Sequence, residues 1–184
     1  TPHPGWHDSN SPLEWLLETW HDTEPMYQCA LFLIPRRLLD LTGGWDERLS
    51  LINDFEFFSR LVLTSDGIAF TSDARLFYRS GLQGSLSNLK SRKGCESACL
   101  STLLGTRHLL NREDSLRTRR ASADMLRANV HVFYPLFPDL LTPVEAEITR
   151  LGGSRLRPQG GRAFRMISRL LGWRVALRIR RAVA

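Results

Sequence analysis

The chain has 184 residues, a net charge of +6, and hydrophobic and charged fractions of 42% and 24%. These proportions are those of one globular domain with its own core. No apolar run reaches the roughly 18 to 20 residues that cross a bilayer, which excludes a transmembrane protein. The first residues lack a secretory-signal pattern and three cysteines form no disulfide framework, so we expect a cytoplasmic protein.

The positive charge is concentrated at the C-terminal end. From Arg150 onward the chain carries ten arginines and no acidic residue, so the residues before it carry a net charge of −4. The basic character therefore belongs to the tail.

The first predicted elements are a helix, a strand and a second helix. Ser11-Pro12-Leu13-Glu14 has the pattern of a capping box and predicts a helix that runs to about Trp20. Residues 26–34 are almost continuously apolar, which is typical of a strand covered on both faces of an α/β sheet. Pro35 ends this strand and begins a helix from Arg36 to Leu41, which Gly43-Gly44 terminates.

A further helix and two short strands follow. Apolar residues at helical spacing after Asn53-Asp54 predict a helix with its N-cap at one of these two residues. Residues 68–71 and 75–79 have the pattern of two strands around a turn.

The remainder of the chain is predicted to be helical. One helix lies in the region from Leu89 onward, a second spans about Ser115 to Phe133, and a third begins at the capping-box pattern Thr142 to Glu145 and stops at Gly152-Gly153. Two cysteines on the first of these helices lack a second Cys or His pair at ligand spacing, and we expect both to be buried as small apolar residues: Cys95 and Cys99.

The tail predicts two short basic helices with a hinge at Gly172-Trp173. Before Gly172 the apolar side chains lie opposite the arginines, and after it arginines occupy the side where the apolar residues had been. Residues 162–181 either anchor the protein on an anionic membrane surface or pack as a solvated helix on the domain or on a partner. Nucleic-acid binding is not expected, since no recognition motif accompanies the charge.

Four motifs follow one another between about residues 26 and 90. The first is an apolar strand followed by arginines, from Cys29 to Arg37, and the second is a Gly-Gly-aromatic-Asp turn, from Gly43 to Asp46. The third is the start of a helix at the position of an acidic pair, Asn53-Asp54, and the fourth is a strand that ends in Tyr-Arg, from Ala74 to Arg79. This ordered set resembles the C-terminal, acceptor-side portion of a family 2 glycosyltransferase with the GT-A fold.

The resemblance implies an inverting transfer of a sugar from a nucleotide-sugar donor to a glycan or lipid-linked acceptor. Asp54 matches the general base that deprotonates the acceptor hydroxyl. Asn53 stands where the family usually has an acidic residue, and this loss of a like charge makes Asp54 less inclined to hold a proton. Trp45 and Asp46 match the turn that shapes the sugar pocket, and Arg79 matches a position near the diphosphate.

The family's nucleotide-binding half and its Asp-x-Asp metal motif do not occur in this sequence. The resemblance implies Mg or Mn in the complete enzyme, so we expect an inactive fragment when this chain stands alone. The expected fold class is α/β, with residues 1–88 as the acceptor-side part of a GT-A, Rossmann-like domain. Residues 89–153 would be a helical extension and residues 154–184 a basic amphipathic tail, with the protein peripheral on the inner face of the membrane.

Two simpler interpretations remain open. In the first, the segment from Gly43 to Arg60 is purely structural, with a helix stop, a core Trp45, an N-cap and a carboxylate that complements the helix dipole. In the second, the chain is a non-catalytic helical module that binds a membrane or partner through its arginine-rich tail.

Overall fold

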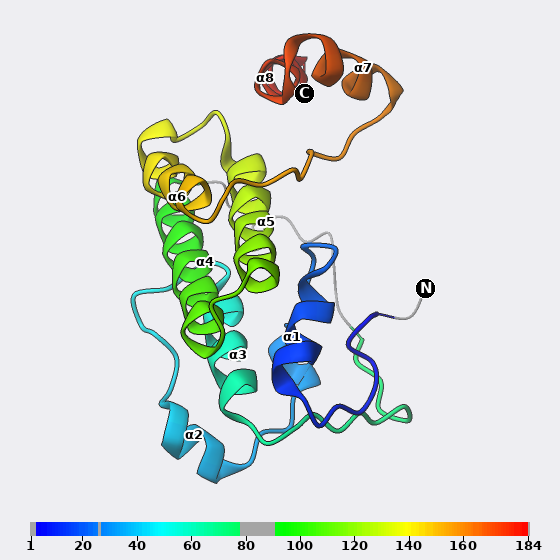
Figure 1. Cartoon of the computed structure of the whole chain (residues 1–184), viewed down its shortest axis with the longest axis vertical. Helices are drawn as coiled ribbons and strands as arrows, with labels where there is room; N and C mark the ends of the chain where they lie inside the picture. The colour runs from blue at the N-terminus through cyan, green and yellow to red at the C-terminus, as the bar shows by residue number, and fades with distance from the viewer. Residues whose placement is uncertain (1–2, 26, 78–90, 184) are drawn as a thin grey trace.

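The structure is a computed structural model that describes residues 3–25, 27–77 and 91–183. The elements in chain order are α1 (Pro12–Trp20), the short 3-10 helix η1 (Cys29–Leu31), α2 (Arg36–Thr42), α3 (Asn53–Thr64), α4 (Arg92–Arg112), α5 (Leu116–Phe133), α6 (Pro138–Arg150), α7 (Arg162–Leu171) and α8 (Trp173–Val183) (Figure 1).

The predicted α/β fold class is wrong, because the described part of the chain contains no sheet. The apolar run expected as a strand forms η1 instead, and its Leu33 is fully exposed. The segment expected as a strand at residues 68–71 makes one isolated bridge, between Ser9 and Ile68. Residues 75–77 are not a strand, and residues 78 and 79 lie outside the described ranges.

The physical reason lies in the backbone. A strand must pair its N–H and C=O groups with neighbouring strands, and the described chain supplies no partner for the apolar run. The backbone N–H groups of this run therefore find hydrogen-bond acceptors within the run. The side chain of Gln28 accepts a hydrogen bond from the backbone N–H of Ala30 at 2.7 Å, and the N–H of Leu31 donates to the carbonyl of Gln28 at 3.0 Å.

Most of the predicted helices are confirmed. The elements α1, α2 and α5 begin at the predicted positions, and α5 opens with a capping box between Ser115 and Thr118. The predicted helix α3 is also present, but it begins at Asn53, one or two residues earlier than an N-cap at Asn53 or Asp54 would place it. Ser11 is the N-cap of α1, although its side chain makes no cap hydrogen bond. The prediction for α6 is wrong at its start, because the helix begins at Pro138 and has Pro143 inside it.

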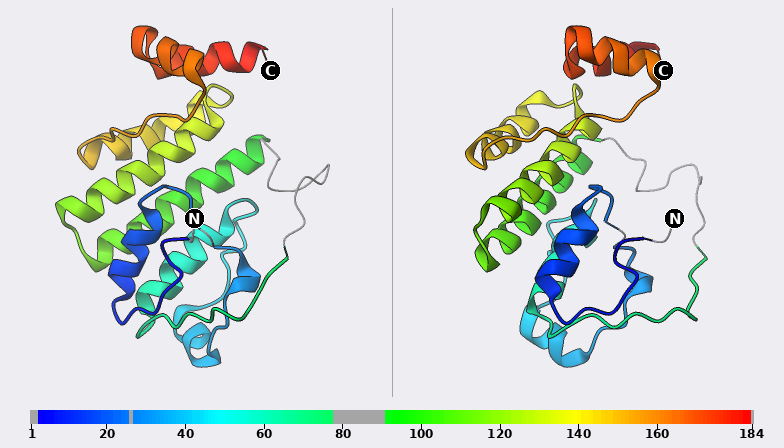
Figure 2. Two further views of the ribbon diagram at one scale, coloured as in Figure 1. Left: turned by 90° about the vertical axis from the view of Figure 1, so that its right-hand side faces the viewer. Right: turned by 45° about the vertical axis from the view of Figure 1, so that its right-hand side comes forward.

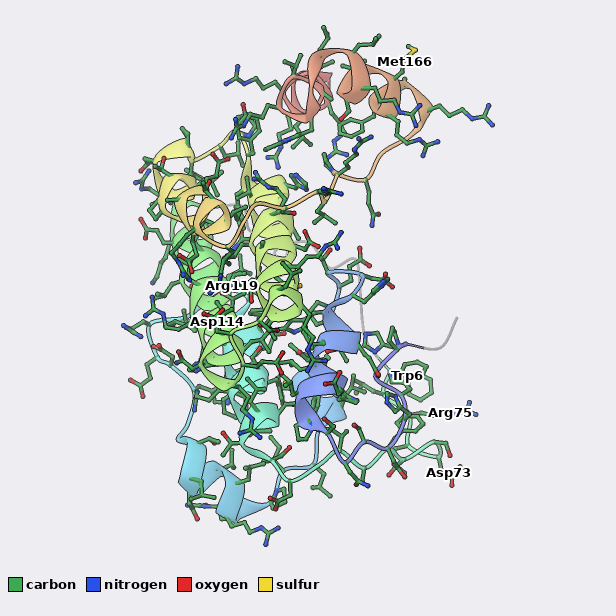
Figure 3. All side chains as sticks on the ribbon, viewed as in Figure 1. Trp6, Asp73, Arg75, Asp114, Arg119 and Met166 are labelled. Carbon is green, nitrogen blue, oxygen red and sulfur yellow. The ribbon has the colours of Figure 1, made fainter. Side chains whose placement is uncertain are left out.

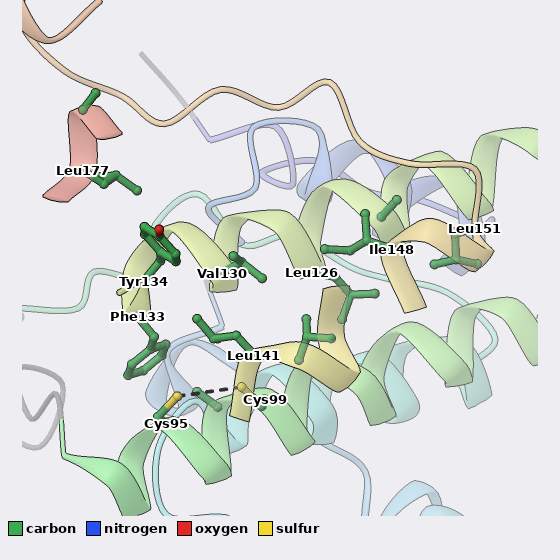
Figure 4. Packing of buried hydrophobic residues seen from close by; sticks show 14 of the residues in the cluster. Cys95, Cys99, Leu126, Val130, Phe133, Tyr134, Leu141, Ile148, Leu151 and Leu177 are labelled. Atoms are coloured by element: carbon green, nitrogen blue, oxygen red, sulfur yellow. Dashed lines mark hydrogen bonds between the residues drawn. The ribbon is translucent and has the colours of Figure 1, made fainter. Parts of the chain in front are cut away.

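The helices α4, α5 and α6 form a bundle around the first of two hydrophobic clusters. Cys95 and Cys99 are buried in this cluster, as predicted, with their sulfur atoms 3.9 Å apart (Figure 4). Its other fully enclosed side chains come mainly from α5 and α6, and include Leu126, Val130, Phe133, Leu141 and Ile148.

The helices α1 and α3 pack beside the other part of α4 and α5 (Figure 2). They enclose the second cluster, which contains Trp15, Trp20, Tyr27, Phe55 and Phe58. Gly105 of α4 lets α3 approach closely, because a Cβ atom there would lie 2.5 Å from the Phe55 ring. This packing fixes the position of the start of α3.

The helices α7 and α8 pack against each other at one end of the molecule (Figure 1). The predicted hinge is confirmed: Gly172 separates the two helices with a φ of 84°, a conformation that favours glycine. Phe164, Ala176 and Leu177 join them to the first cluster. In the described ranges, no helix is both long and apolar enough to cross a membrane.

Candidate active site around Asp54

The candidate site begins at the turn that leads into α3. Ile52 is the N-cap of this helix, and its φ of 58° and ψ of 25° place it in the left-handed region. A β-branched residue rarely adopts this conformation, which costs about 1 to 2 kcal/mol. Other contacts must therefore hold the turn in place.

Two buried serines of α4 supply those contacts. The hydroxyl oxygen of Ser97 accepts hydrogen bonds from the N–H groups of Ser50 at 2.8 Å and Leu51 at 2.9 Å. The hydroxyl of Ser101 donates to the carbonyl of Ile52 at 2.5 Å and accepts from the N–H of Glu56 at 3.2 Å. The turn is thus anchored on a helix that lies far along the chain.

Asp54 is the second residue of α3 and is half-buried. Its Oδ1 accepts a hydrogen bond from the N–H of Phe55 at 2.9 Å, and within the described ranges no other residue donates to its carboxylate. Burial raises the pKa of the Asp54 carboxyl, against the effect of the backbone hydrogen bonds. A carboxylate with a raised pKa is a better proton acceptor near neutral pH, as general-base chemistry requires.

Trp45 packs on two α3 side chains that follow Asp54 by about one helical turn. Its ring stacks on that of Phe57, with centroids 4.0 Å apart, and meets Phe58 edge-on at 6.0 Å. These two phenylalanines are three and four residues after Asp54, and residues at that spacing share a helix face. Trp45 remains 42% exposed, so it offers an aromatic surface on the side of α3 where these two phenylalanines lie.

The double-glycine loop is tied to α3 by Arg60. Its guanidinium donates to the carbonyls of Thr42 and, at 3.0 Å, of Gly44. Glu56 orients Arg60 at 2.8 Å and also contacts His108 Nε2 at 2.9 Å. Burial alone would raise the pKa of Glu56, but the hydrogen bonds from His108 and Arg60 outweigh it and hold that pKa at about 2.

Asp46, predicted to help shape the sugar pocket, already has a partner in Arg48. The Arg48 guanidinium donates to both of its carboxylate oxygens, at 2.9 Å and 2.6 Å, and these hydrogen bonds lower the pKa of Asp46 to about 2. The carboxylate therefore stabilises the loop that carries Trp45. Its role toward a sugar stays a prediction.

The remaining predicted site residues are placed as follows. Asn53 is the first residue of α3 and half-buried, and neither Asn53 nor Asp54 is the N-cap, because Ile52 holds that position without a side-chain cap. Arg79 lies outside the described residues. Ser97, Ser101 and His108 were not predicted as part of the site: their only signal in the sequence is a helical spacing that many core residues share.

The divalent metal that the resemblance implies has no fitting ligand set here. The sequence has no Asp-x-Asp, and within residues 3–25, 27–77 and 91–183 no three His, Cys, Asp or Glu side chains form a group suited to a metal ion. We therefore derive no step through a metal.

Comparison with known proteins leaves the family open: no family model, no curated protein and no solved structure matches this chain.

Proposed function

We propose that this chain contributes the acceptor side of a glycosyltransferase, with Asp54 as the general base. The proposal rests on the two motifs that do not require a strand, the Gly43 to Asp46 turn and the Asn53-Asp54 start of a helix. It also rests on one structural observation, the half-buried Asp54 carboxylate next to the strained turn at Ile52. Strained backbone is found preferentially at functional sites, where the surrounding contacts hold it. The α/β fold does not form part of this proposal.

The chemistry assigns each group a role. The acceptor hydroxyl donates its proton to Asp54 as its oxygen attacks the anomeric carbon of a nucleotide sugar. The bond from that carbon to the diphosphate oxygen breaks, the nucleoside diphosphate leaves with the electron pair, and the anomeric configuration inverts. A hydroxyl is a weak nucleophile, so a carboxylate within about 3 Å accelerates this step.

Trp45 supports the same function. Sugars present C–H groups on one face of the ring, and an exposed indole can hold that face by apolar contact. The contacts of Arg60 and Arg48 fix the loop on which Trp45 lies, so the aromatic surface is already in place before a substrate binds. The nucleotide-binding groups would be supplied from outside these 184 residues.

The test is glycosyl transfer by the full-length protein. The release of nucleoside diphosphate from UDP-glucose, UDP-galactose, UDP-N-acetylglucosamine and GDP-mannose is measured with methyl glycosides and polyprenyl phosphate as acceptors. We expect Asp54→Asn to lower kcat at least about 100-fold, because a general base contributes that much or more. Asp40→Asn, which changes an exposed carboxylate paired with Arg36, is the matched control and should leave kcat unchanged.

Two outcomes would overturn the proposal. One is wild-type transfer by Asp54→Asn, since the base would then be elsewhere. The other is a folded wild-type protein that transfers no sugar from any of the four donors.

A further inference from the structure

The helix α7 has an exposed face that combines cationic and apolar side chains. Arg162, Arg165 and Arg169 recur at intervals of three and four residues, so they share one side of the helix. Met166 and Leu170 lie beside them and are 60% and 76% exposed. Met166 points away from the rest of the molecule (Figure 3).

The opposite face of α7 holds the helix on the protein. Phe164 is buried and belongs to the first hydrophobic cluster, and Ile167 packs against that cluster. The exposed band of α7 therefore lies outside the hydrophobic cluster. Its side chains border a wide, open hollow of about 620 Å³, lined by Arg162, Arg165, Met166, Arg169 and Leu170.

The arginines of α8 differ, because they are already used inside the molecule. Arg174 pairs with Glu145 at 2.7 Å, Arg180 donates to the carbonyl of Gln159 at 2.9 Å, and Arg181 donates to the carbonyl of Val132. Arg178 lies over the ring of Tyr134, 5.6 Å from its centroid.

On α7, Arg165 donates to the carbonyl of Gly160 at 3.1 Å. Over the described ranges, no carboxylate lies within 4 Å of any of the three α7 arginines. From Arg150 onward the sequence also contains no acidic residue. The positive charge of this face is therefore not neutralised by the chain around it.

We propose that α7 docks the protein on the surface of a bilayer that contains anionic phospholipid. The helix lies in the plane of the interface, Met166 and Leu170 enter the acyl boundary, and the three arginines bind lipid phosphate groups. A short amphipathic helix with basic residues beside an apolar stripe is the form that such peripheral anchors take. A nucleic acid would match the charge but would leave the two apolar side chains in water.

This inference is independent of the proposed glycosyltransferase. Of the two tail helices, only α7 is proposed to bind the membrane, because the arginines of α8 contact other residues of the protein. In Figure 1, α7 lies at one end of the molecule, away from α3, the helix that carries Asp54.

The test is co-sedimentation of the full chain with vesicles of phosphatidylcholine alone and of phosphatidylcholine with 30% phosphatidylglycerol. We expect binding to the second vesicles, and about a tenfold or greater loss of the partition coefficient in Arg165→Gln/Arg169→Gln. The matched control is Arg107→Gln/Arg120→Gln, which removes the same charge from exposed positions on α4 and α5 and should change binding less than threefold.

A second pair of variants tests the apolar contribution. Met166→Ser/Leu170→Ser keeps every charge and should still lower the partition coefficient several-fold, because both substitutions remove apolar surface that enters the membrane. Circular dichroism confirms that each variant is folded. The proposal is overturned if this pair binds as the wild type does, if the two arginine pairs lose binding equally, or if a 20-base-pair DNA duplex competes fully with the vesicles.

Discussion

Glu56 is a buried carboxylate held between the guanidinium of Arg60 and the imidazole of His108. Its side chain is only 5% exposed, and its hydrogen bonds orient the arginine that fixes the double-glycine loop. Removing one partner of a buried ion pair leaves the other charge without compensation, which costs more than the pair itself contributes. The stability of this region therefore depends on the charge of Glu56.

We expect Glu56→Gln to lower the free energy of unfolding by about 3 kcal/mol at pH 7. The folded pKa of about 2 lies below the ordinary value of 4.5, so the ionised carboxylate stabilises the fold above pH 4.5 and this contribution is lost as the pH falls toward 2. Urea unfolding at pH 7 and pH 3 measures both effects, and the difference between wild type and variant should narrow at the lower pH.

The matched control is Glu96→Gln, at an exposed carboxylate paired with Arg92. It should change the free energy of unfolding by less than about 0.5 kcal/mol. If the two variants lose the same stability, the buried pair contributes no more than a surface pair.

At the scale of the elements, the sequence predicted most helices and was wrong about the strands. Helix starts follow from local patterns: Ser115 and the apolar spacing after it predict α5 without knowledge of the rest of the fold. A strand depends on its neighbours, and the apolar run at residues 26–34 looks the same whether or not a second strand lies beside it. Whether this run forms a strand therefore depends on neighbouring strands, which its own residues do not reveal.

The candidate site divides in the same way. The position of Asp54 in the first turn of α3 was predicted from the residues around it. Ser97 and Ser101 were not, because their hydrogen bonds reach across 45 to 49 residues of sequence and leave no local pattern. The pair of Asp46 and Arg48 is local, since the two residues are two positions apart. It was still not predicted, because each side chain could equally have faced solvent.

The contact between α3 and α4 depends on the absence of a side chain at Gly105. A Cβ atom there would lie 2.5 Å and 2.7 Å from two atoms of the Phe55 ring, and 3.3 Å from the Ser59 hydroxyl. We expect Gly105→Ala to lower the free energy of unfolding by about 1 to 2 kcal/mol, because the clash exceeds the gain in helix propensity.

Thermal or urea unfolding measures this loss. Gly44→Ala is the matched control, since a Cβ atom at Gly44 would meet nothing within 4 Å, and its stability should stay within about 0.5 kcal/mol of wild type. An unchanged stability in Gly105→Ala would mean that α3 and α4 can separate at no cost, and that the turn before Asp54 is less firmly held than its hydrogen bonds indicate.

At the scale of the whole molecule, His131 is one of the residues through which the helical bundle contacts the tail. This residue lies on α5, is buried, and its ring meets that of Trp173 of α8 edge-on, 4.8 Å between centroids. Within the described ranges its Nε2 atom has no hydrogen-bond partner. Burial, with a smaller effect from the charges of Arg127 and Arg180, lowers the pKa of His131 from 6.5 to about 4.

The neutral imidazole is therefore the form that the folded state accepts. Below pH 6.5 the unfolded chain binds a proton at this position and the folded chain does not, so the free energy of unfolding falls as the pH drops from about 6.5 to 4 and levels off below that. Between pH 7 and pH 5 the expected contribution of His131 is about 2 kcal/mol.

Urea unfolding of wild type and His131→Gln at pH 7 and pH 5 isolates this effect, because glutamine does not titrate and the other groups are common to both proteins. The variant should lose about 2 kcal/mol less than wild type over that interval. His21→Gln, at an exposed histidine, is the matched control and should keep the wild-type dependence. Hydrogen exchange at pH 5 should show the first opening in α8, since its opening exposes His131 to water, where the imidazole can bind the proton that the folded state excludes. Equal pH dependence in wild type and His131→Gln would contradict this coupling.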